Sequence, residues 1–153
     1  MCSSDLTQAR AVDAYAGIGM LTARLAEGAA EVIAVEESPY SVRLGQVNMQ
    51  LNGIGNVTYQ RARVEDSASR IEQPIDVLVL DPPRAGCAEA AVDAMAKLAP
   101  ERIVYISCEP STLARDVNRF CAAGRYTLVE VALVDMFPQT YHIEAVVKLE
   151  RNA

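Results

Sequence analysis

The hydrophobic pattern of the chain alternates between two kinds of segment. Short runs of Val, Ile, Leu and Ala predict buried strands, and longer stretches with an apolar residue every three or four positions predict helices. The predicted strands cover residues 11–15, 32–35, 57–59, 75–80, 102–107, 126–134 and 143–149. The predicted helices cover residues 20–27, 38–51, 88–98 and 111–123. Strands joined by helical crossovers form a mainly parallel sheet with helices on both faces.

The last two predicted strands break this alternation. The segment between them, residues 135–142, contains Pro138 and has no helical period. Strands joined without a crossover helix pair antiparallel, so we expect a C-terminal hairpin. The predicted fold class is therefore α/β, with a doubly wound, mostly parallel sheet that ends in an antiparallel hairpin.

The length of the chain limits it to one such domain. It has 153 residues, of which 51% are apolar, and this is enough to fill a single core. No apolar run approaches the roughly 20 residues of a membrane span, and no secretory signal is recognisable. We therefore expect a cytoplasmic protein without membrane contact. Residues 1–6 fit no element, so we interpret residues 1–9 as a leader, either foreign or native, before a domain at 10–153.

The chain is acidic, with a formal net charge of −6. Tight electrostatic binding to nucleic acid rests on clustered Lys and Arg, so the overall balance argues against it. Among the 14 basic residues, only Lys97 and Lys148 are lysines. The others are arginines, whose planar fork of donors suits phosphates and base edges. The sequence is therefore still compatible with a local basic patch that contacts nucleic acid.

Cysteine and histidine are too scattered for a metal site. The 4 cysteines have no Cys-x-x-Cys spacing, and His142 is the 1 histidine of the chain. We therefore expect neither a metal ion nor a disulfide framework. We interpret Cys87 and Cys121 as small buried hydrophobes, whereas Cys108 directly follows a predicted strand.

A glycine-rich turn follows the first predicted strand. Gly17 and Gly19 let the backbone turn sharply and approach a ligand, at the edge where doubly wound sheets bind ligands. Glu36 follows the second strand, where a carboxylate can accept hydrogen bonds from both hydroxyls of a ribose. These features fit either a dinucleotide or S-adenosylmethionine, and a purely structural turn is the alternative. Thr22 stands where a dinucleotide motif has its third glycine, which disfavours the dinucleotide.

Two further strand ends carry residues with unusual chemistry. Asp81 follows the most apolar strand and precedes two prolines, which stiffen the backbone and leave the carboxylate facing the cleft. Cys108 precedes a predicted helix with Ser111 as its N-cap, and the positive end of that helix favours the reactive thiolate. A loop breaker and a small buried thiol are the structural alternatives to these two functional interpretations.

Two residues near the last predicted strand are candidates for a group that transfers protons. Glu144 lies among apolar residues of that strand, and a half-buried carboxyl suits proton transfer near neutral pH. His142 titrates near neutrality without any perturbation. The spacing of the residues leaves both candidates open.

Several motifs, taken in order, resemble those of the RNA uracil-5-methyltransferases, the S-adenosylmethionine-dependent enzymes that make 5-methyluridine in tRNA and 23S rRNA. The resemblance extends over nearly everything from Ala11 to Leu149, and the last two motifs are the most specific. The motifs are Asp13-Ala14-Tyr15-Ala16-Gly17-Ile18-Gly19, Glu36, Gly45-Gln46-Val47-Asn48 through Asn52-Gly53, Asp81-Pro82-Pro83-Arg84-Ala85-Gly86, Tyr105-Ile106-Ser107-Cys108-Glu109-Pro110-Ser111-Thr112-Leu113-Ala114-Arg115-Asp116 and Asp135-Met136-Phe137-Pro138-Gln139-Thr140-Tyr141-His142-Ile143-Glu144.

The resemblance implies a Rossmann-like methyltransferase domain that methylates carbon 5 of a uridine in RNA. It gives Cys108 the role of nucleophile and Glu144 the role of general base. Glu109 stands where the family most often has Asn, a change in local hydrogen bonding that leaves the thiol in place. The residues implied to bind S-adenosylmethionine are Tyr15, Met20, Glu36 and Asp81, with Gly17 and Gly19 of the glycine turn.

The resemblance also implies a partner and further domains. Members of the family usually carry an upstream RNA-binding domain and a central domain, so the expected partner is an RNA, either rRNA or tRNA. An RNA cytosine-5-methyltransferase is a competing interpretation, although Pro83 stands where such enzymes place a second cysteine. A nicotinamide-binding domain is a second competing interpretation. A module that binds S-adenosylmethionine but cannot capture RNA by itself is a third.

Overall fold

The structure, a computed structural model, describes residues 8–72, 74–136, 138–140 and 143–152. Its centre is a seven-stranded sheet in the order β3-β2-β1-β4-β5-β7-β6. The strands are β1 (Arg10–Ala14), β2 (Glu31–Glu36), β3 (Val57–Arg61), β4 (Val77–Leu80), β5 (Arg102–Ser107), β6 (Tyr126–Val134) and β7 (Glu144–Arg151). The helices are α1 (Met20–Ala26), α2 (Pro39–Leu51), α3 (Val64–Ser67), α4 (Glu89–Lys97) and α5 (Pro110–Cys121), with 3₁₀ turns at Ala68–Arg70 and Ala122–Gly124.

The sheet is parallel from β3 to β5 and antiparallel at its C-terminal side. β1 pairs with β2 and β4, β2 pairs with β3, and β4 pairs with β5, all in parallel. β7 runs antiparallel between β5 and β6. The predicted α/β class, the mostly parallel sheet and the antiparallel hairpin are therefore confirmed. Because the parallel strands run in one direction, β1, β2, β4 and β5 all end at the same edge of the sheet.

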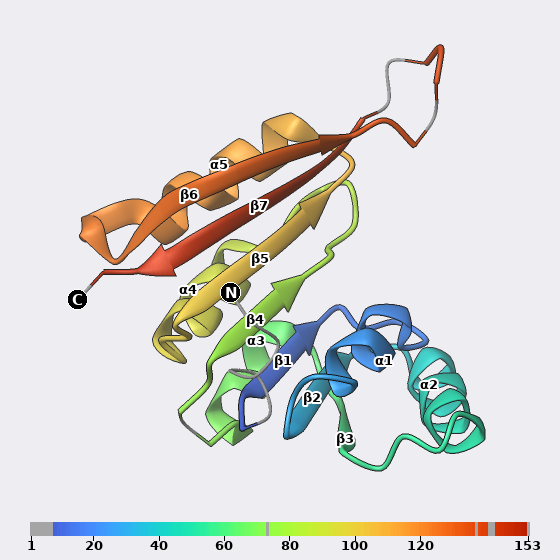
Figure 1. The fold of residues 1–153 in the computed structure, drawn as a ribbon. Helices are drawn as coiled ribbons and strands as arrows, with labels where there is room; N and C mark the ends of the chain where they lie inside the picture. The colour runs from blue at the N-terminus through green and yellow to red at the C-terminus, as the bar shows by residue number, and fades with distance from the viewer. Residues whose placement is uncertain (1–7, 73, 137, 141–142, 153) are drawn as a thin grey trace.

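Helices cover both faces of the sheet, as a doubly wound fold requires. α1 and α2 lie on one face, whereas α4 and α5 lie on the other with α3 packed against α4 (Figure 1). Fully buried side chains between the layers include Val12, Val35, Leu78, Leu80 and Tyr105. β5 and the first part of β7 bury every second residue, because α4 and α5 cover one face of these strands. This packing fixes where the carboxyl ends of the strands lie.

The start of α5 differs from the prediction. The helix begins at Pro110 and is capped by Glu109, not by Ser111. Proline is favoured in the first turn, because its fixed φ suits a helix and its missing N–H would have no intrahelical acceptor. The Glu109 carboxylate accepts hydrogen bonds from the Ser111 N–H (3.4 Å) and the Ser111 hydroxyl (2.8 Å). As a consequence, Cys108 immediately precedes the N-cap of α5.

The short helix α3, between β3 and β4, is absent from the sequence prediction. A four-residue helix (Val64–Ser67) is too short to show a helical period. Val64 and Ser67 are both buried in the folded protein. Tertiary packing therefore stabilises α3, since a helix of one turn is not stable alone.

Candidate active site

The turn between β1 and α1 has the backbone conformation that its glycines predict. Gly17 and Gly19 have φ values of +55° and +92°, in the left-handed region that favours glycine. Tyr15, at the start of the turn, also has a positive φ of 67°. A left-handed conformation costs a residue with a side chain about 1–2 kcal/mol. The surrounding structure therefore holds Tyr15 in a strained conformation at the carboxyl end of β1.

The Glu36 carboxylate fastens this turn to the end of β2. One carboxylate oxygen accepts the Gly17 N–H (3.0 Å), and the other accepts the Ser38 N–H (2.8 Å). An ionised carboxylate offers about four acceptor sites. Glu36 is therefore a structural link that retains acceptor capacity for a ligand.

Two glycines on different elements make room for one aromatic ring beneath the turn. A Cβ atom at Gly19, or at Gly45 on α2, would overlap the hydroxyl of Tyr59 on β3. The Tyr59 side chain therefore packs against the turn and α2 together, and burial raises the pKa of its hydroxyl. This contact explains why glycine occurs inside α2, where it weakens a helix.

Asp13, on β1, is a fully buried carboxyl under the same turn. It accepts a hydrogen bond from the Thr22 hydroxyl on α1 (2.5 Å), and its Oδ1 atom has no hydrogen-bond partner among the described residues. Burial raises the pKa of Asp13 to about 6 against the opposing effect of Thr22, and the Asp81 carboxylate adds a smaller rise. Thr22, which replaces the third glycine of a dinucleotide motif, thus has a structural role in joining α1 to β1.

The raised pKa of Asp13 makes stability depend on pH in a way that Asp13→Asn should remove. Because the folded state binds this proton more tightly than the unfolded chain, the stabilisation is present below pH about 4 and is lost as pH rises through about 6. Between pH 5 and 7, this group should lower the free energy of unfolding by about 1 kcal/mol. Urea unfolding at pH 5 and at pH 7 measures this loss. The free energy of unfolding should fall less between these pH values in Asp13→Asn than in the unaltered protein, and equal falls would contradict the raised pKa.

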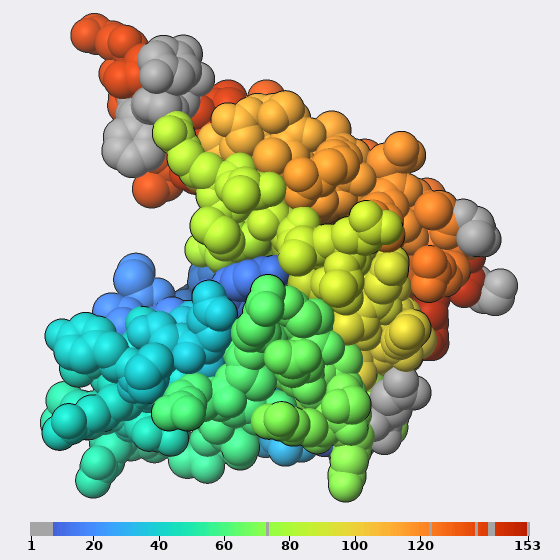
Figure 2. Space-filling view, turned by 180° about the vertical axis from the view of Figure 1, so that it is seen from behind, coloured from blue at the N-terminus to red at the C-terminus, as the bar shows by residue number. Residues whose placement is uncertain are grey.

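A cavity of about 180 Å³ opens beside Glu36 at the carboxyl edge of the sheet. Figure 2 shows the surface hollowed there, between the side formed by α1 and α2 (blue and cyan) and the segment after β4 (lime). Tyr15 and Glu36 line the cavity, as do Arg63, Glu65 and Gly86. Sequence reasoning missed Arg63 and Glu65 because they flank the start of α3, which has no recognisable pattern. For Gly86, the motif Asp81-Pro82-Pro83-Arg84-Ala85-Gly86 was a signal in the sequence that could have indicated its place in the cavity wall.

The antiparallel pairing of β5 and β7 brings Cys108 and Glu144 together. Ser107, the last residue of β5, pairs with Ala145, so Cys108 directly follows and Glu144 directly precedes the last residue pair between these strands. Both residues are half-buried. The predicted nucleophile and the predicted base therefore both lie at the carboxyl edge of β5.

Asp81, after β4, lies near Glu144. Burial raises the pKa of Asp81, and the Glu144 carboxylate raises it further, so the two carboxyl groups interact electrostatically. Asp81 thus lies between the end of β5 and the turn after β1, because β4 lies between β1 and β5 in the sheet. The candidate site residues therefore lie along one edge of the sheet, at the ends of β1, β2, β4 and β5.

Comparison with known proteins identifies the family. The family model described as tRNA (Uracil-5-)-methyltransferase matches residues 3–152. The chain belongs to this family. Membership agrees with the motif resemblance, which extends from Ala11 to Leu149.

Curated relatives of this uracil-5-methyltransferase family member are longer proteins. An uncharacterized RNA methyltransferase of Thermosynechococcus vestitus is 46% identical over 142 residues, which cover 93% of this chain and 32% of the relative. Another, from Thermotoga maritima, is 44% identical over 141 residues, which cover 92% of this chain and 32% of the relative. The chain therefore spans about a third of the length of the curated relatives it matches.

Solved structures confirm the predicted Rossmann-like methyltransferase fold. The tRNA (uracil-54, C5)-methyltransferase of Pyrococcus abyssi, in complex with S-adenosyl-L-homocysteine, has a TM-score of 0.80 and 29% identity, covering 96% of this chain and 36% of that chain. An rRNA methylase of Streptococcus thermophilus has a TM-score of 0.79 and 19% identity, covering 99% of this chain and 92% of that chain. The second likeness is one of fold alone.

The other site residues predicted from the uracil-5-methyltransferase motifs lie at the same edge. In the described part of the chain, the wall of the cavity does not include Gly17, Gly19, Met20 or Asp81. Met20 is 79% exposed at the first position of α1. His142, the alternative base, lies outside the described residues. The structure therefore brings Tyr15 and Glu36 to the cavity, and it places Cys108, Glu144 and Asp81 at the same edge of the sheet.

The remaining predictions concern metals, membranes and cysteines. Among the described residues, no group of three or more His, Cys, Asp or Glu side chains could hold a metal ion. No helix in the described ranges has the length and the hydropathy to cross a membrane. Cys87 is buried as predicted, whereas Cys121 is half-buried.

Proposed function

We propose that residues 10–153 form the catalytic domain of an RNA uracil-5-methyltransferase, which transfers a methyl group from S-adenosylmethionine to carbon 5 of a uridine. The observation that best supports this proposal is that Cys108 and Glu144 adjoin the same terminal pair of β5 and β7, with Asp81 near Glu144. This chemistry needs a nucleophilic thiol and a proton acceptor at one site. Both lie at the edge of the sheet that also carries the cavity beside Glu36.

The residues around the cavity fit S-adenosylmethionine. The Glu36 carboxylate has acceptor sites left for the two ribose hydroxyls, and the backbone at Gly17 is open, since a Cβ atom there would meet no atom within 4 Å. When bound, this cofactor supplies an electrophilic methyl group. The residues proposed to contact it are Tyr15, Gly17, Gly19, Met20, Glu36 and Asp81.

The proposed roles of Cys108 and Glu144 follow from the weak nucleophilicity of carbon 5 in uracil. The Cys108 thiolate adds to carbon 6, and the electron pair of the ring double bond moves onto the ring as an enolate. Carbon 5 of this enolate would then take the methyl group that bound S-adenosylmethionine supplies, which would leave S-adenosylhomocysteine. Glu144 takes the proton left on carbon 5, the double bond re-forms, and the Cys108 thiolate leaves.

The proposed substrate is a cytoplasmic RNA, either rRNA or tRNA. A base within a helix must leave its stack to reach a pocket of this kind. The net charge of −6 gives this domain little overall electrostatic attraction for RNA. We therefore expect RNA shape and single-stranded contacts, rather than charge on this domain, to select the uridine.

Trapping with RNA that contains 5-fluorouridine tests the proposal. Fluorine at carbon 5 cannot be removed as a proton, so a working enzyme stays attached to the RNA after methyl transfer. The purified chain, S-adenosylmethionine and this RNA should give an adduct that contains the protein, the RNA and one methyl group by intact mass. An absent adduct, with S-adenosylhomocysteine still bound, would leave only a cofactor-binding module. Methylation of cytosine instead would establish the alternative cytosine-5 chemistry.

Glu36→Ala should weaken cofactor binding. Loss of hydrogen bonds to a charged acceptor is expected to cost about 1.5–3 kcal/mol, which is roughly tenfold or more in Kd for S-adenosylhomocysteine by calorimetry. Glu31→Ala, at the other end of β2, is the matched control and should leave the Kd unchanged, because Glu31 pairs with Arg10 instead. An unchanged Kd in Glu36→Ala would place the ribose contact elsewhere.

A further inference from the structure

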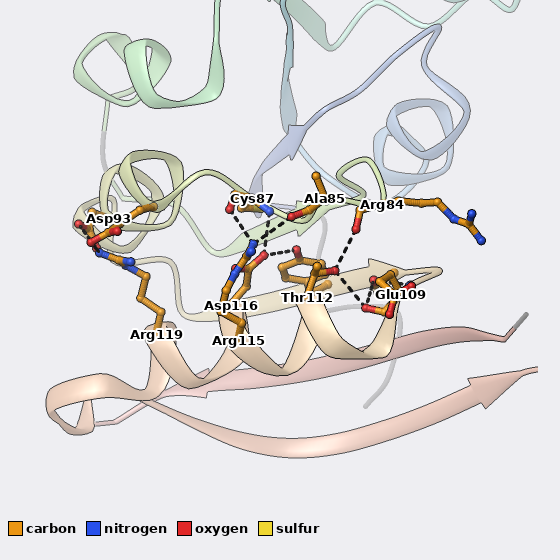
Figure 3. A network of polar contacts seen from close by, with 12 residues as sticks. Arg84, Ala85, Cys87, Asp93, Glu109, Thr112, Arg115, Asp116 and Arg119 are labelled. Carbon is orange, nitrogen blue, oxygen red and sulfur yellow. Dashed lines mark hydrogen bonds and ion pairs between the residues drawn. The ribbon is translucent and has the colours of Figure 1, made fainter.

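The loop between β4 and α4, residues 81–88, is held from behind by one face of α5. The Thr112 hydroxyl donates to the Arg84 carbonyl (3.1 Å), and the Arg115 guanidinium donates to the carbonyl of Ala85 (3.1 Å). Figure 3 shows these side chains pointing from α5 toward the loop. Positions three and four apart share one face of a helix, so residues 112, 115 and 116 all face the loop.

Asp116 is the centre of these contacts. Its side chain is 2% exposed, and Oδ2 accepts hydrogen bonds from the Cys87 N–H (2.7 Å) and the Tyr105 hydroxyl (2.7 Å). Oδ1 accepts from Nε of Arg115 (2.9 Å), and Nη2 of the same guanidinium donates to the Cys87 carbonyl (3.1 Å). Both backbone polar groups of Cys87 are thereby bound to adjacent residues of α5. A buried carboxylate with several donors is costly to rearrange, so it fixes the loop in place.

Gly86 shows how closely the loop approaches this pair. Its φ is +74°, and a Cβ atom there would lie 2.6 Å from Nη2 of Arg115 and 2.7 Å from Oδ2 of Asp116. On its other side, Gly86 lines the cavity beside Glu36, and so does Ala88. The cavity wall therefore rests directly on Arg115 and Asp116.

We propose that Asp116 and Arg115 are positioning residues, which set the distance between the cofactor and the nucleophile. The inference rests on the proposed function. The same helix that holds the Gly86–Ala88 wall begins directly after Cys108 and its neighbour Glu109. The clamp formed by Asp116 and Arg115 therefore links the cofactor wall to the thiol through one rigid element. A misplacement of about 1 Å between reacting groups can lower a rate by about a hundredfold.

The test compares Asp116→Asn and Arg115→Ala with Arg119→Ala. Arg119 lies one turn further along α5 and binds Glu89 and Asp93 on α4, outside the loop (Figure 3). In Asp116→Asn, the side-chain amide keeps only one acceptor oxygen. Its NH₂ group then faces the N–H and O–H donors that the carboxylate accepts in the unaltered protein. The Arg115 side chain is 56% exposed, so its removal leaves the core intact. Each variant is studied well below its own Tm.

The first readout is hydrogen exchange at the Cys87 amide, measured without any ligand. Exchange should become about tenfold faster in Asp116→Asn, as expected for loss of a hydrogen bond to a charged acceptor, and stay unchanged in Arg119→Ala. The second readout is kcat and KM in methylation, with the Kd for S-adenosylhomocysteine. We expect a several-fold weaker Kd and a kcat lower by up to about a hundredfold in both clamp variants.

The outcomes separate this inference from the proposed function. Unchanged exchange at Cys87 in Asp116→Asn, or equal Kd values in the clamp variants and Arg119→Ala, would overturn the positioning role. A lower Tm with unchanged Kd and kcat would also overturn it, since it would show a purely structural effect. If the unaltered chain formed no adduct with 5-fluorouridine RNA, the proposed function would fail, whereas hydrogen exchange and Kd would still decide the clamp.

Discussion

Replacing Cys108 by alanine is expected to abolish the covalent adduct with 5-fluorouridine RNA and to lower methylation by roughly 10⁴-fold or more. The physical reason is that the proposed addition to carbon 6 of the ring requires the Cys108 thiolate. The residues described as lining the cavity beside Glu36 do not include Cys108. The Kd for S-adenosylhomocysteine should therefore stay unchanged, and calorimetry measures this directly.

Cys121→Ala is the matched control for this experiment. Cys121 is also a free, half-buried thiol, but it lies at the opposite end of α5. Adduct formation should persist in Cys121→Ala. A cysteine-independent adduct, or a large loss of cofactor affinity in Cys108→Ala, would remove Cys108 from the role of nucleophile.

Replacing Glu144 by glutamine is expected to make an adduct accumulate on RNA with ordinary uridine. Methyl transfer still occurs, because it needs the thiolate and not the carboxylate. The proton on carbon 5 then has no acceptor, so elimination fails and turnover falls by about 10²–10⁴-fold. Denaturing gels in the presence of S-adenosylmethionine measure the trapped species, and its mass should include one methyl group.

Glu150→Gln is the control on the same strand. Glu150 belongs to β7 but pairs with Lys148 far from the carboxyl edge of β5, so its loss should leave turnover unchanged. Normal turnover in Glu144→Gln would show that another group removes the proton from carbon 5. His142, the alternative base, is then the first residue to test, and water is the other candidate acceptor.

The fold class could be predicted because the relevant signals are local. Short apolar runs and the glycine turn indicate the strands and their order along the chain without knowledge of distant contacts. The left-handed conformation of Gly17 and Gly19 is likewise a property of the residue type. The start of α5 was misplaced because Ser111 and Glu109 are both able to cap, and the fixed φ of Pro110 decided between them.

Non-local features were missed for a physical reason. α3 is too short for a periodic signal and depends on packing, so the cavity wall at Arg63 and Glu65 was not foreseen. Glu36 was expected to bind a ligand, but its bonds to the N–H groups of Gly17 and Ser38 depend on how the ends of β1 and β2 meet. Asp116 carried no signal beyond its motif, since its burial arises from the approach of a distant loop.

The sequence by itself determined which residues carry chemistry, because a thiol, a carboxyl or a glycine keeps its properties wherever it lies. It also determined the order of strands and helices, since that order follows from short-range periodicity. Only the tertiary structure decided that β7 lies between β5 and β6, and that its register brings Glu144 to the end of β5, which Cys108 follows. Strand register depends on contacts between distant segments, and a shift of one residue would turn Glu144 to the other face of the sheet.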